Sequence, residues 1–294
     1  MAQQIINGLV VGSVYALFSL GFTLIFGLQR VLNLAHGAVF MWGAFVGLYA
    51  TEAGLPLAVA LPLAMAVSGL LGALLELLVF RPLRRRNASE FAAIVASIGA
   101  ALILMGLAQQ VSDTQVMRYP PDVFPLVIHR FWGLRLSLLQ ITIMALVVAI
   151  VVGLVLYVYH TGIGRQMRAV SVNERTARLL GVNPNLVHLQ AIVLSGALAG
   201  AAGVIIGVAF NSVHFLMGEP FLLRALVIVV IGGLGSIAGA VVAGLLLGLI
   251  QTLVVVTPYS GLADAIIFGL LFLMLLVRPN GLFGDAHQVG GGGR

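Results

Sequence analysis

The residues best placed to do chemistry in this sequence lie in one polar stretch, from Gly162 to Pro184, between two long apolar blocks. Ser171 and Glu174 have the spacing of a capping box, in which the hydroxyl accepts from an early backbone N–H of a helix and the carboxylate bonds back. Gly181 supplies a left-handed stop, and Pro184 follows where a helix cannot continue. The spacing predicts one short amphipathic helix of about ten residues.

Two kinds of side chain follow this predicted helix at helical spacing. Val172, Leu179 and Leu180 share one side, and Arg175 and Arg178 lie on another. Two functions fit such a helix: a solvated basic loop that fixes membrane topology, or a docking helix offered to a soluble partner. The rest of the sequence is needed to distinguish between these two functions.

Several classes of catalytic site are excluded by residue types that the chain lacks. It has no cysteine, so we expect no disulfide, thiolate nucleophile or Cys-ligated metal. All fifteen basic residues are arginine, which excludes a Walker A lysine and a Schiff-base lysine. We expect no bound metal or cofactor, and any ATP hydrolysis that serves this chain takes place on another polypeptide.

Composition predicts an all-α, polytopic membrane protein. Hydrophobic residues make up 61% of the 294 positions and charged residues 8%, against about 25% in soluble domains. Several apolar runs reach the roughly 20 residues that cross a bilayer, and the alternation of a membrane β-barrel is missing. The net charge of +6 comes from arginines that set topology, so we expect no nucleic-acid partner.

We expect a single transmembrane domain over residues 1–294. The N-terminus lacks the basic region of a cleavable signal, so its first apolar run is predicted to be a permanent span. Arg81 is expected to end the third span. Residues 112–135 are predicted to form an outer loop, and 285–294 a disordered tail. The predicted spans are 5–28, 31–50, 56–80, 91–111, 136–159, 187–210, 213–231, 237–256 and 262–277.

Span count depends on residues 213–236, which form either a full span or a re-entrant or half-helical element, so the total is eight or nine. The arginines favour an outer N-terminus and a cytoplasmic C-terminus, because eleven of the fifteen then lie inside. The polar stretch, taken as a loop over residues 160–186, is then cytoplasmic. The inner arginines are Arg30, Arg81, Arg84, Arg85, Arg86, Arg165, Arg168, Arg175, Arg178, Arg278 and Arg294.

Motifs in the order of the chain resemble one family of permeases. They are NLAHGAVFMWGA, E-x-x-x-x-RP at Glu76–Pro82, GRQMRA, RTARLLGVNPN, SGALAGAAGVIIG, GGLGSIAGA and RPNGLFG. They are similar to the permeases of bacterial branched-chain amino-acid ABC transporters, and most to the shorter, H-type subunit. The resemblance covers about residues 5 to 284, and the short outer loop departs from it.

The resemblance implies an importer in the inner membrane. A longer, M-type permease would share the pathway, two cytoplasmic ATPases would use ATP and Mg²⁺, and an extracytoplasmic binding protein would deliver leucine, isoleucine or valine. Urea and short amides are the alternative substrates within the same family. The resemblance assigns contact with the ATPases to Gly164, Arg168, Ser171, Val172, Glu174, Arg175, Arg178, Leu179, Leu180 and Gly181.

Candidates for the substrate pathway are polar or glycine residues at membrane depth, where a polar group faces protein or water. We expect His36 to be a hydrogen-bonded structural residue, with a place in the gate as the alternative. Glu219 and Arg224 could bind the ammonium and carboxylate of an amino acid, although a mutual salt bridge is favoured. The full set is Asn33, His36, Gly37, Glu219, Arg224, Gly232, Gly233 and Gly235.

Two further carboxylates are expected to have structural roles: Glu76 pairs with the arginine cluster that follows it, and Asp264 is a helix N-terminal charge. Two rival functions fit less well. A secondary transporter or channel needs carboxylates or a polar filter in its central spans, which offer almost none. A membrane-embedded enzyme needs clustered His, Asp or Glu, and the six histidines are scattered.

Overall fold

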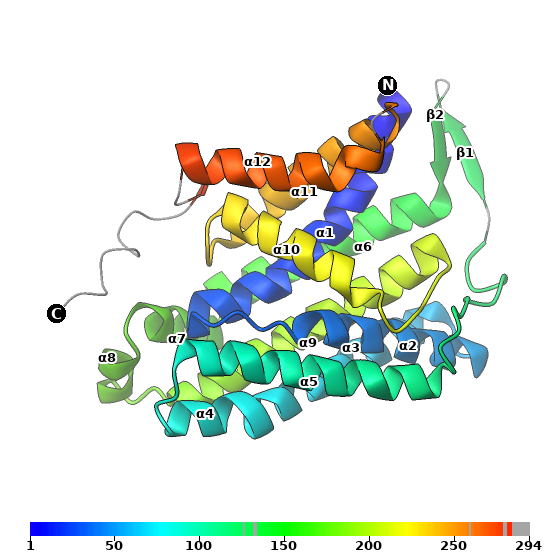
Figure 1. The fold of residues 1–294 in the computed structure, drawn as a ribbon. Coiled ribbons are helices and arrows are strands. Elements are labelled where there is room, and N and C mark those ends of the chain that lie inside the picture. Colours follow the sequence, from blue (N-terminus) through cyan, green and yellow to red (C-terminus); the bar gives the residue numbers. More distant parts are fainter. Residues whose placement is uncertain (126, 132–133, 259, 279–280, 284–294) are drawn as a thin grey trace.

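Long helices that run along one common direction form the body of the protein (Figure 1). The computed structural model describes residues 1–125, 127–131, 134–258, 260–278 and 281–283. The helices are α1 (Ala2–Gln29), α2 (His36–Glu52), α3 (Leu57–Leu75), α4 (Arg81–Arg85), α5 (Glu90–Val111), α6 (Leu138–His160), α7 (Gly162–Val172), α8 (Glu174–Leu179), α9 (Pro184–Phe210), α10 (Gly218–Gly232), α11 (Ile237–Val255) and α12 (Ala263–Val277).

Each of the nine predicted spans corresponds to one helix of the described chain. Seven of these helices are long and apolar enough to cross a membrane. The other two, α2 and α10, have 17 and 15 residues, and α12 reaches spanning length only together with the turn Ser260–Leu262 before it. Residues 211–217 are not helical, so the element predicted at 213–236 is a short helix with a non-helical lead-in.

The centre of the bundle is built on α1 and α9. Their apolar windows are 78% buried, against 6% for α12 at the periphery. Helix α1 packs along α11, and α9 packs along α3 and α2. Small residues allow this approach: a side chain on Gly12 would lie 2.8 Å from the backbone of Leu245. This is expected for helices in lipid, which associate by close van der Waals packing at small residues rather than by the hydrophobic effect.

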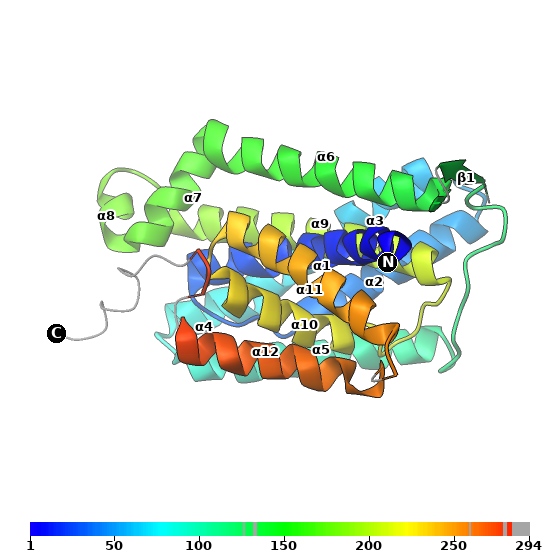
Figure 2. The ribbon, with the colours of Figure 1, turned by 90° about the horizontal axis from the view of Figure 1, so that it is seen from above.

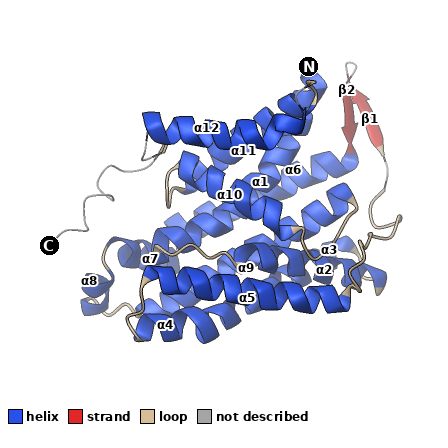
Figure 3. Cartoon of the chain, viewed as in Figure 1, coloured by secondary structure: helices blue, strands red, loops and turns tan. Residues whose placement is uncertain are grey.

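A β-hairpin interrupts the otherwise helical chain at one end of the bundle (Figure 3). Strands β1 (Ile128–Phe131) and β2 (Leu134–Ser137) pair antiparallel, with Ile128 opposite Ser137. The predicted outer loop therefore contains strands that an all-helical prediction lacks. The preceding segment is anchored as well, because the buried Tyr119 hydroxyl donates to the Ala44 carbonyl at 3.0 Å. Burial raises the pKa of Tyr119, so this hydroxyl remains a donor.

The opposite end carries α4, α7 and α8, as Figures 1 and 2 show together. The third span does not end at Arg81 as predicted: a π-helical turn, Glu76–Phe80, carries the helix on into α4 and Arg85. Because arginine is a good helix former, a charge run alone does not stop a helix. The arginines of α4, α7 and α8 thus gather at one end, and the hairpin lies at the other. The tail predicted at 285–294 lies outside the described residues.

Candidate functional site

The polar stretch folds as two helices, α7 and α8, that meet at Asn173. Asn173 is extended and its side chain accepts from the Thr176 N–H at 3.0 Å, so it caps α8. Ser171 remains inside α7, where its hydroxyl donates to the Arg168 carbonyl at 2.9 Å. The predicted capping box of Ser171 and Glu174 is therefore wrong. Asparagine is as strong an N-cap as serine, and here it starts the helix two residues later.

The end of α8 follows the prediction. Gly181 has a left-handed φ of 84°, and its N–H donates to the Arg178 carbonyl at 3.1 Å. Pro184 begins α9, where its missing N–H costs no helical hydrogen bond. At the other end of the segment, Gly164 packs so tightly on the Val158 carbonyl of α6 that no side chain fits. Both glycines thus fix how α7 and α8 leave the bundle.

Three apolar side chains of this segment are open. Val172, Leu179 and Leu180 are 81%, 84% and 78% exposed. Ala177 of α8 is instead buried, in a cluster that includes Val187 of α9 and holds α8 to the bundle. All three open side chains are left uncovered by the described chain, but Val172 ends α7 while Leu179 and Leu180 lie at the end of α8, so the prediction that one helix carries them on one side is wrong.

The arginines of the segment divide between two roles. Arg175 is exposed, and Arg178 donates to Glu174 at 2.9 Å within α8. Arg168 instead donates to the Val158 carbonyl and lies over the ring of Tyr159. Arg168 therefore secures α7 to α6, and the open surface of α8 carries Arg175 and Arg178.

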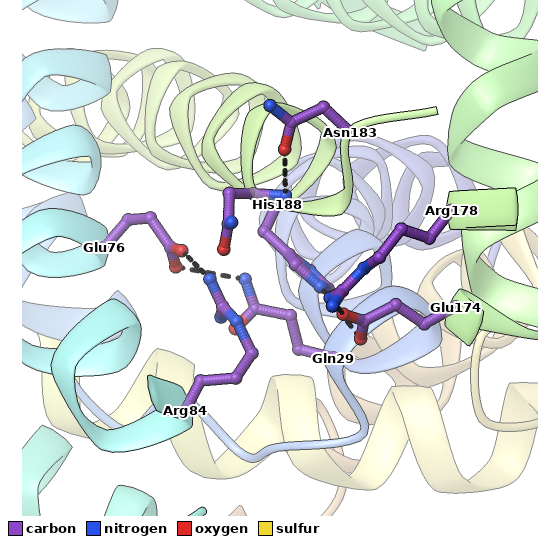
Figure 4. A network of polar contacts seen from close by, with 8 residues as sticks. Gln29, Glu76, Arg84, Glu174, Arg178, Asn183 and His188 are labelled. Carbon is purple, nitrogen blue, oxygen red and sulfur yellow. Dashed lines mark hydrogen bonds and ion pairs between the residues drawn. The ribbon is translucent and has the colours of Figure 1, made fainter. Parts of the chain in front are cut away.

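A network of charged and polar side chains lies beneath α8 (Figure 4). Buried Glu76, in the π-helical turn, accepts from Arg84 and from Gln29 Nε2 at 3.2 Å. Its predicted pairing with the arginine cluster is confirmed. On the α8 side, Glu174 Oε2 lies 3.6 Å from His188 Nε2.

The two halves of this network share a cavity of about 200 Å³. Gln29 and Arg84 line it from one side, and Glu174 and His188 from the other. No motif in the sequence marks His188 or Gln29, since each is a lone polar residue near a helix end. The cavity places the carboxylate of α8 close to the last residue of α1.

The second candidate region is the crossing of α2 and α10. The two helices meet at Gly37 and Gly218, where a side chain on Gly37 would lie 2.9 Å from the Gly218 carbonyl oxygen. Both helices begin there: α2 at His36, after the non-helical residues 30–35, and α10 at Gly218, after residues 211–217. The predicted interruption near Asn33 and His36 is therefore real, and α10 has a matching one.

His36 is the buried residue on which α2 starts. Its Nε2 lies 3.2 Å from the Phe18 carbonyl oxygen, and its Nδ1 lies 3.4 Å from the Ser195 hydroxyl. Its ring also packs on the ring of Phe18, with centroids 4.7 Å apart. Asn33 accepts from the Ala35 N–H at 3.1 Å and so shapes the turn into α2. His36 is thus packed and hydrogen-bonded as expected, and its place in a gate stays a prediction.

Arg224 and Glu219 do not pair with each other. Arg224 bonds to Asp264 of α12 at 3.2 Å, and its guanidinium lies 5.6 Å from the ring centre of Tyr15. The predicted salt bridge is wrong because residues five apart on a helix point in different directions, whereas partners three or four apart share a face. Asp264 does lie in the first turn of its helix, as predicted.

The glycines near 232–235 form the turn between α10 and α11. Gly232 packs against Gly239, and Gly235, with φ of 84°, lies against Gly27 at the end of α1. Gly233 also has a left-handed φ, of 102°. These contacts give the glycines a packing role at the end that carries α7, and their place in a pathway stays a prediction.

A cavity of about 190 Å³ opens beside the crossing of α2 and α10. Glu219 lines it, together with apolar residues of α5 such as Ile98 and Met105. The α5 wall is not predictable from the sequence, because an apolar span without charged residues gives no sign of which face lines a cavity.

The comparisons with known proteins concern nearly the whole chain. Residues 4–276 match the family model described as branched-chain amino acid transport system / permease component. The chain is 31% identical to the high-affinity branched-chain amino acid transport system permease protein BraD of Pseudomonas aeruginosa, over 96% of this chain and 95% of that protein. It is 29% identical to LivH of Escherichia coli, with the same coverage, and 26% identical to LivM, over 92% of this chain and 67% of LivM.

Proposed function

The chain belongs to the family of branched-chain amino acid transport system permease components, and from that premise we propose that it is the shorter permease subunit of an ATP-driven importer of branched-chain amino acids. The family match over residues 4–276 carries this proposal. The helices long enough to cross a membrane support a place in the inner membrane. Its role is transport rather than catalysis.

We further propose the partners of the chain. A longer permease, similar to LivM, shares the pathway; two cytoplasmic ATPases use ATP and Mg²⁺; and an extracytoplasmic binding protein delivers the substrate. The absence of lysine from the chain supports hydrolysis on separate subunits, because the phosphate-binding loop of such ATPases requires one.

The exposed apolar residues at the end of α7 and the end of α8 support a docking role over a purely topological one. A basic loop that only sets topology needs no exposed Val172, Leu179 and Leu180. Burial of one such leucine contributes about 1.5–3 kcal/mol. A groove on an ATPase that covers this surface gains that energy, and Arg175 and Arg178 at its edge suit acidic residues of the groove.

We expect movement of a docked ATPase to reach the bundle through the polar network beneath α8. Glu174 begins α8 and lies near His188 of α9, while Arg84 and Gln29 line the other side of the same cavity. A displacement of α8 toward or away from the bundle changes the distances in this network. The docking surface of α8 and the interior of the bundle thereby border one cavity.

The test is Leu179→Asp in the assembled transporter. We expect the permease to fold, because Leu179 is exposed, and its affinity for the ATPases to fall roughly tenfold to hundredfold. Leu55→Asp is the matched control, an exposed leucine in the turn after α2 at the opposite end. Co-purification of the ATPases and ATP-dependent uptake of labelled leucine into proteoliposomes are measured.

Loss of both signals with Leu179→Asp, and their retention with Leu55→Asp, is the expected result. Full retention of the ATPases by Leu179→Asp would contradict the docking role of α8. Saturable leucine uptake by the chain alone, without ATP, would contradict the importer subunit in favour of a secondary carrier. Uptake of urea but not leucine would overturn only the substrate.

A further inference from the structure

Glu219 is an exposed charged residue halfway along the bundle, and its partner is absent from the described chain. Two comparable charges are paired: Glu76 with Arg84, and Arg224 with Asp264. No ion pair or side-chain hydrogen bond of Glu219 is present in the residues that the structure describes, and the residue is exposed.

The depth of Glu219 follows from its neighbours. It adjoins Gly218, which packs on Gly37 where α2 begins. The preceding residue, His36, contacts Ser195, eleven residues after the start of α9 and fifteen before its end. Glu219 thus lies near the middle of the bundle. An ionised carboxylate at this depth costs several kcal/mol unless it meets water, protein or a cationic ligand.

The lining of the cavity beside Glu219 suits a small amphiphilic ligand. Apart from the carboxylate its walls are mainly apolar, with Met41 from α2, Ile98 and Met105 from α5, and Leu222 from α10. Its volume of about 190 Å³ is below the roughly 300–1,000 Å³ of sites for drug-sized molecules. It therefore suits one small molecule with a short aliphatic body.

An ionised carboxylate only accepts hydrogen bonds, and a primary ammonium group offers three donors. We propose that this cavity between α2, α5 and α10 is a substrate subsite, in which Glu219 receives the ammonium group of an aliphatic amino acid while the apolar walls hold its side chain. The subsite rests on the proposed function and adds the residue that recognises the substrate. The helical residues that line the subsite come from α2, α5 and α10.

The absence of cysteine from the chain makes the subsite directly testable. Ala101→Cys places a thiol on the α5 wall with little change in volume. In the assembled transporter in nanodiscs, the rate at which a small methanethiosulfonate reagent modifies this chain is measured by mass spectrometry. The probes are leucine, 3-methylbutylamine, which keeps the ammonium and the branched body, and 4-methylpentanoate, which keeps the carboxylate and the body.

We expect leucine and the amine to slow modification at least about fivefold at saturation and the acid to leave it unchanged. Glu219→Gln is expected to raise the amine concentration needed at least about tenfold, since a hydrogen bond between charged groups contributes that much. Glu219→Asp should retain protection. Unchanged modification without ligand, and co-purification of the ATPases, verify that each variant is folded and assembled.

Equal protection by amine and acid in the Ala101→Cys parent would overturn the proposal, and so would full protection by the amine in Glu219→Gln. The first comparison needs no second variant, so a folding defect in Glu219→Gln leaves the proposal falsifiable. Thiol modification requires neither ATP nor leucine uptake, whereas the importer function is measured by ATPase binding and uptake. Failure of the subsite proposal is therefore distinguishable from failure of the proposed function.

Discussion

Gly12→Ala tests whether close approach of α1 and α11 holds the centre of the bundle. The added methyl carbon would lie 2.8 Å from Leu245 Cα, 2.9 Å from its carbonyl oxygen and 3.0 Å from that of Gly244. Ordinary contacts of this kind begin at 3.4 Å. All three neighbours are backbone atoms, so no side chain can rotate away. The helices themselves must separate by roughly half an ångström, and overpacking of this kind costs about 1–3 kcal/mol.

Replacement of glycine by alanine also favours a helix by about 0.5–1 kcal/mol, which offsets part of this cost. The net destabilisation by Gly12→Ala is then about 1–2 kcal/mol. Gly99→Ala is the matched control, because nothing lies within 4 Å of its added carbon in α5. The control should be neutral or slightly stabilising.

The assay is the midpoint of thermal denaturation of the detergent-solubilised chain, followed by fluorescence-detected size exclusion. Gly12→Ala should lower the midpoint by several degrees, at about 2–4 °C per kcal/mol for a chain of this size. Gly99→Ala should leave it unchanged or raise it. A midpoint for Gly12→Ala equal to that of the parent would refute the reasoning that backbone contact at this glycine limits the packing of α1 on α11.

Two further changes test other parts of the structure. Glu76→Gln should lower the free energy of unfolding by about 2 kcal/mol. This is below the 3–5 kcal/mol of a fully buried broken pair, because Arg84 is partly exposed. Thermal denaturation measures the effect, with Glu52→Gln at an exposed position as the control, and an equal effect of both changes would contradict the pairing. Cysteines at Arg178 and Asp122 test topology: an impermeant thiol reagent added from outside should label position 122 only, and labelling of position 178 alone would reverse the orientation.

The helices of this fold are the part that the sequence predicts best. A run of about 20 apolar residues is a long signal that neighbouring segments do not alter, and each predicted span has its helix. Helix ends that are predicted from one residue or one short motif are less reliable. Arg81 did not end the third helix, and Ser171 did not begin α8, because local competitors, helical arginines and Asn173, decide such positions.

Side-chain pairs between residues distant in the chain are the part of the structure that the sequence does not predict. Arg224 pairs with Asp264, 40 residues away, rather than with nearby Glu219, and only the packing of α10 against α12 brings the two together. Glu76 and Arg84 were predictable as a pair because one continuous helical segment carries both. The cavity wall of α5 shows the same limit, since an apolar helix presents similar residues to lipid, to protein and to a cavity.

The docking face of α8 and the proposed subsite are connected through the end of α1. Glu174 starts α8 and shares a cavity with Gln29, the last residue of α1, whose amide bonds to buried Glu76. Residues 30–35 follow Gln29 as a non-helical segment that leads to His36; within it the Leu34 N–H donates to the Ser97 hydroxyl of α5, and Asn33 accepts from the Ala35 N–H. A short segment that is partly buried and held by such hydrogen bonds transmits a displacement of one end to the other. Movement at α8 can therefore shift the start of α2, and with it the Gly37–Gly218 crossing that borders Glu219.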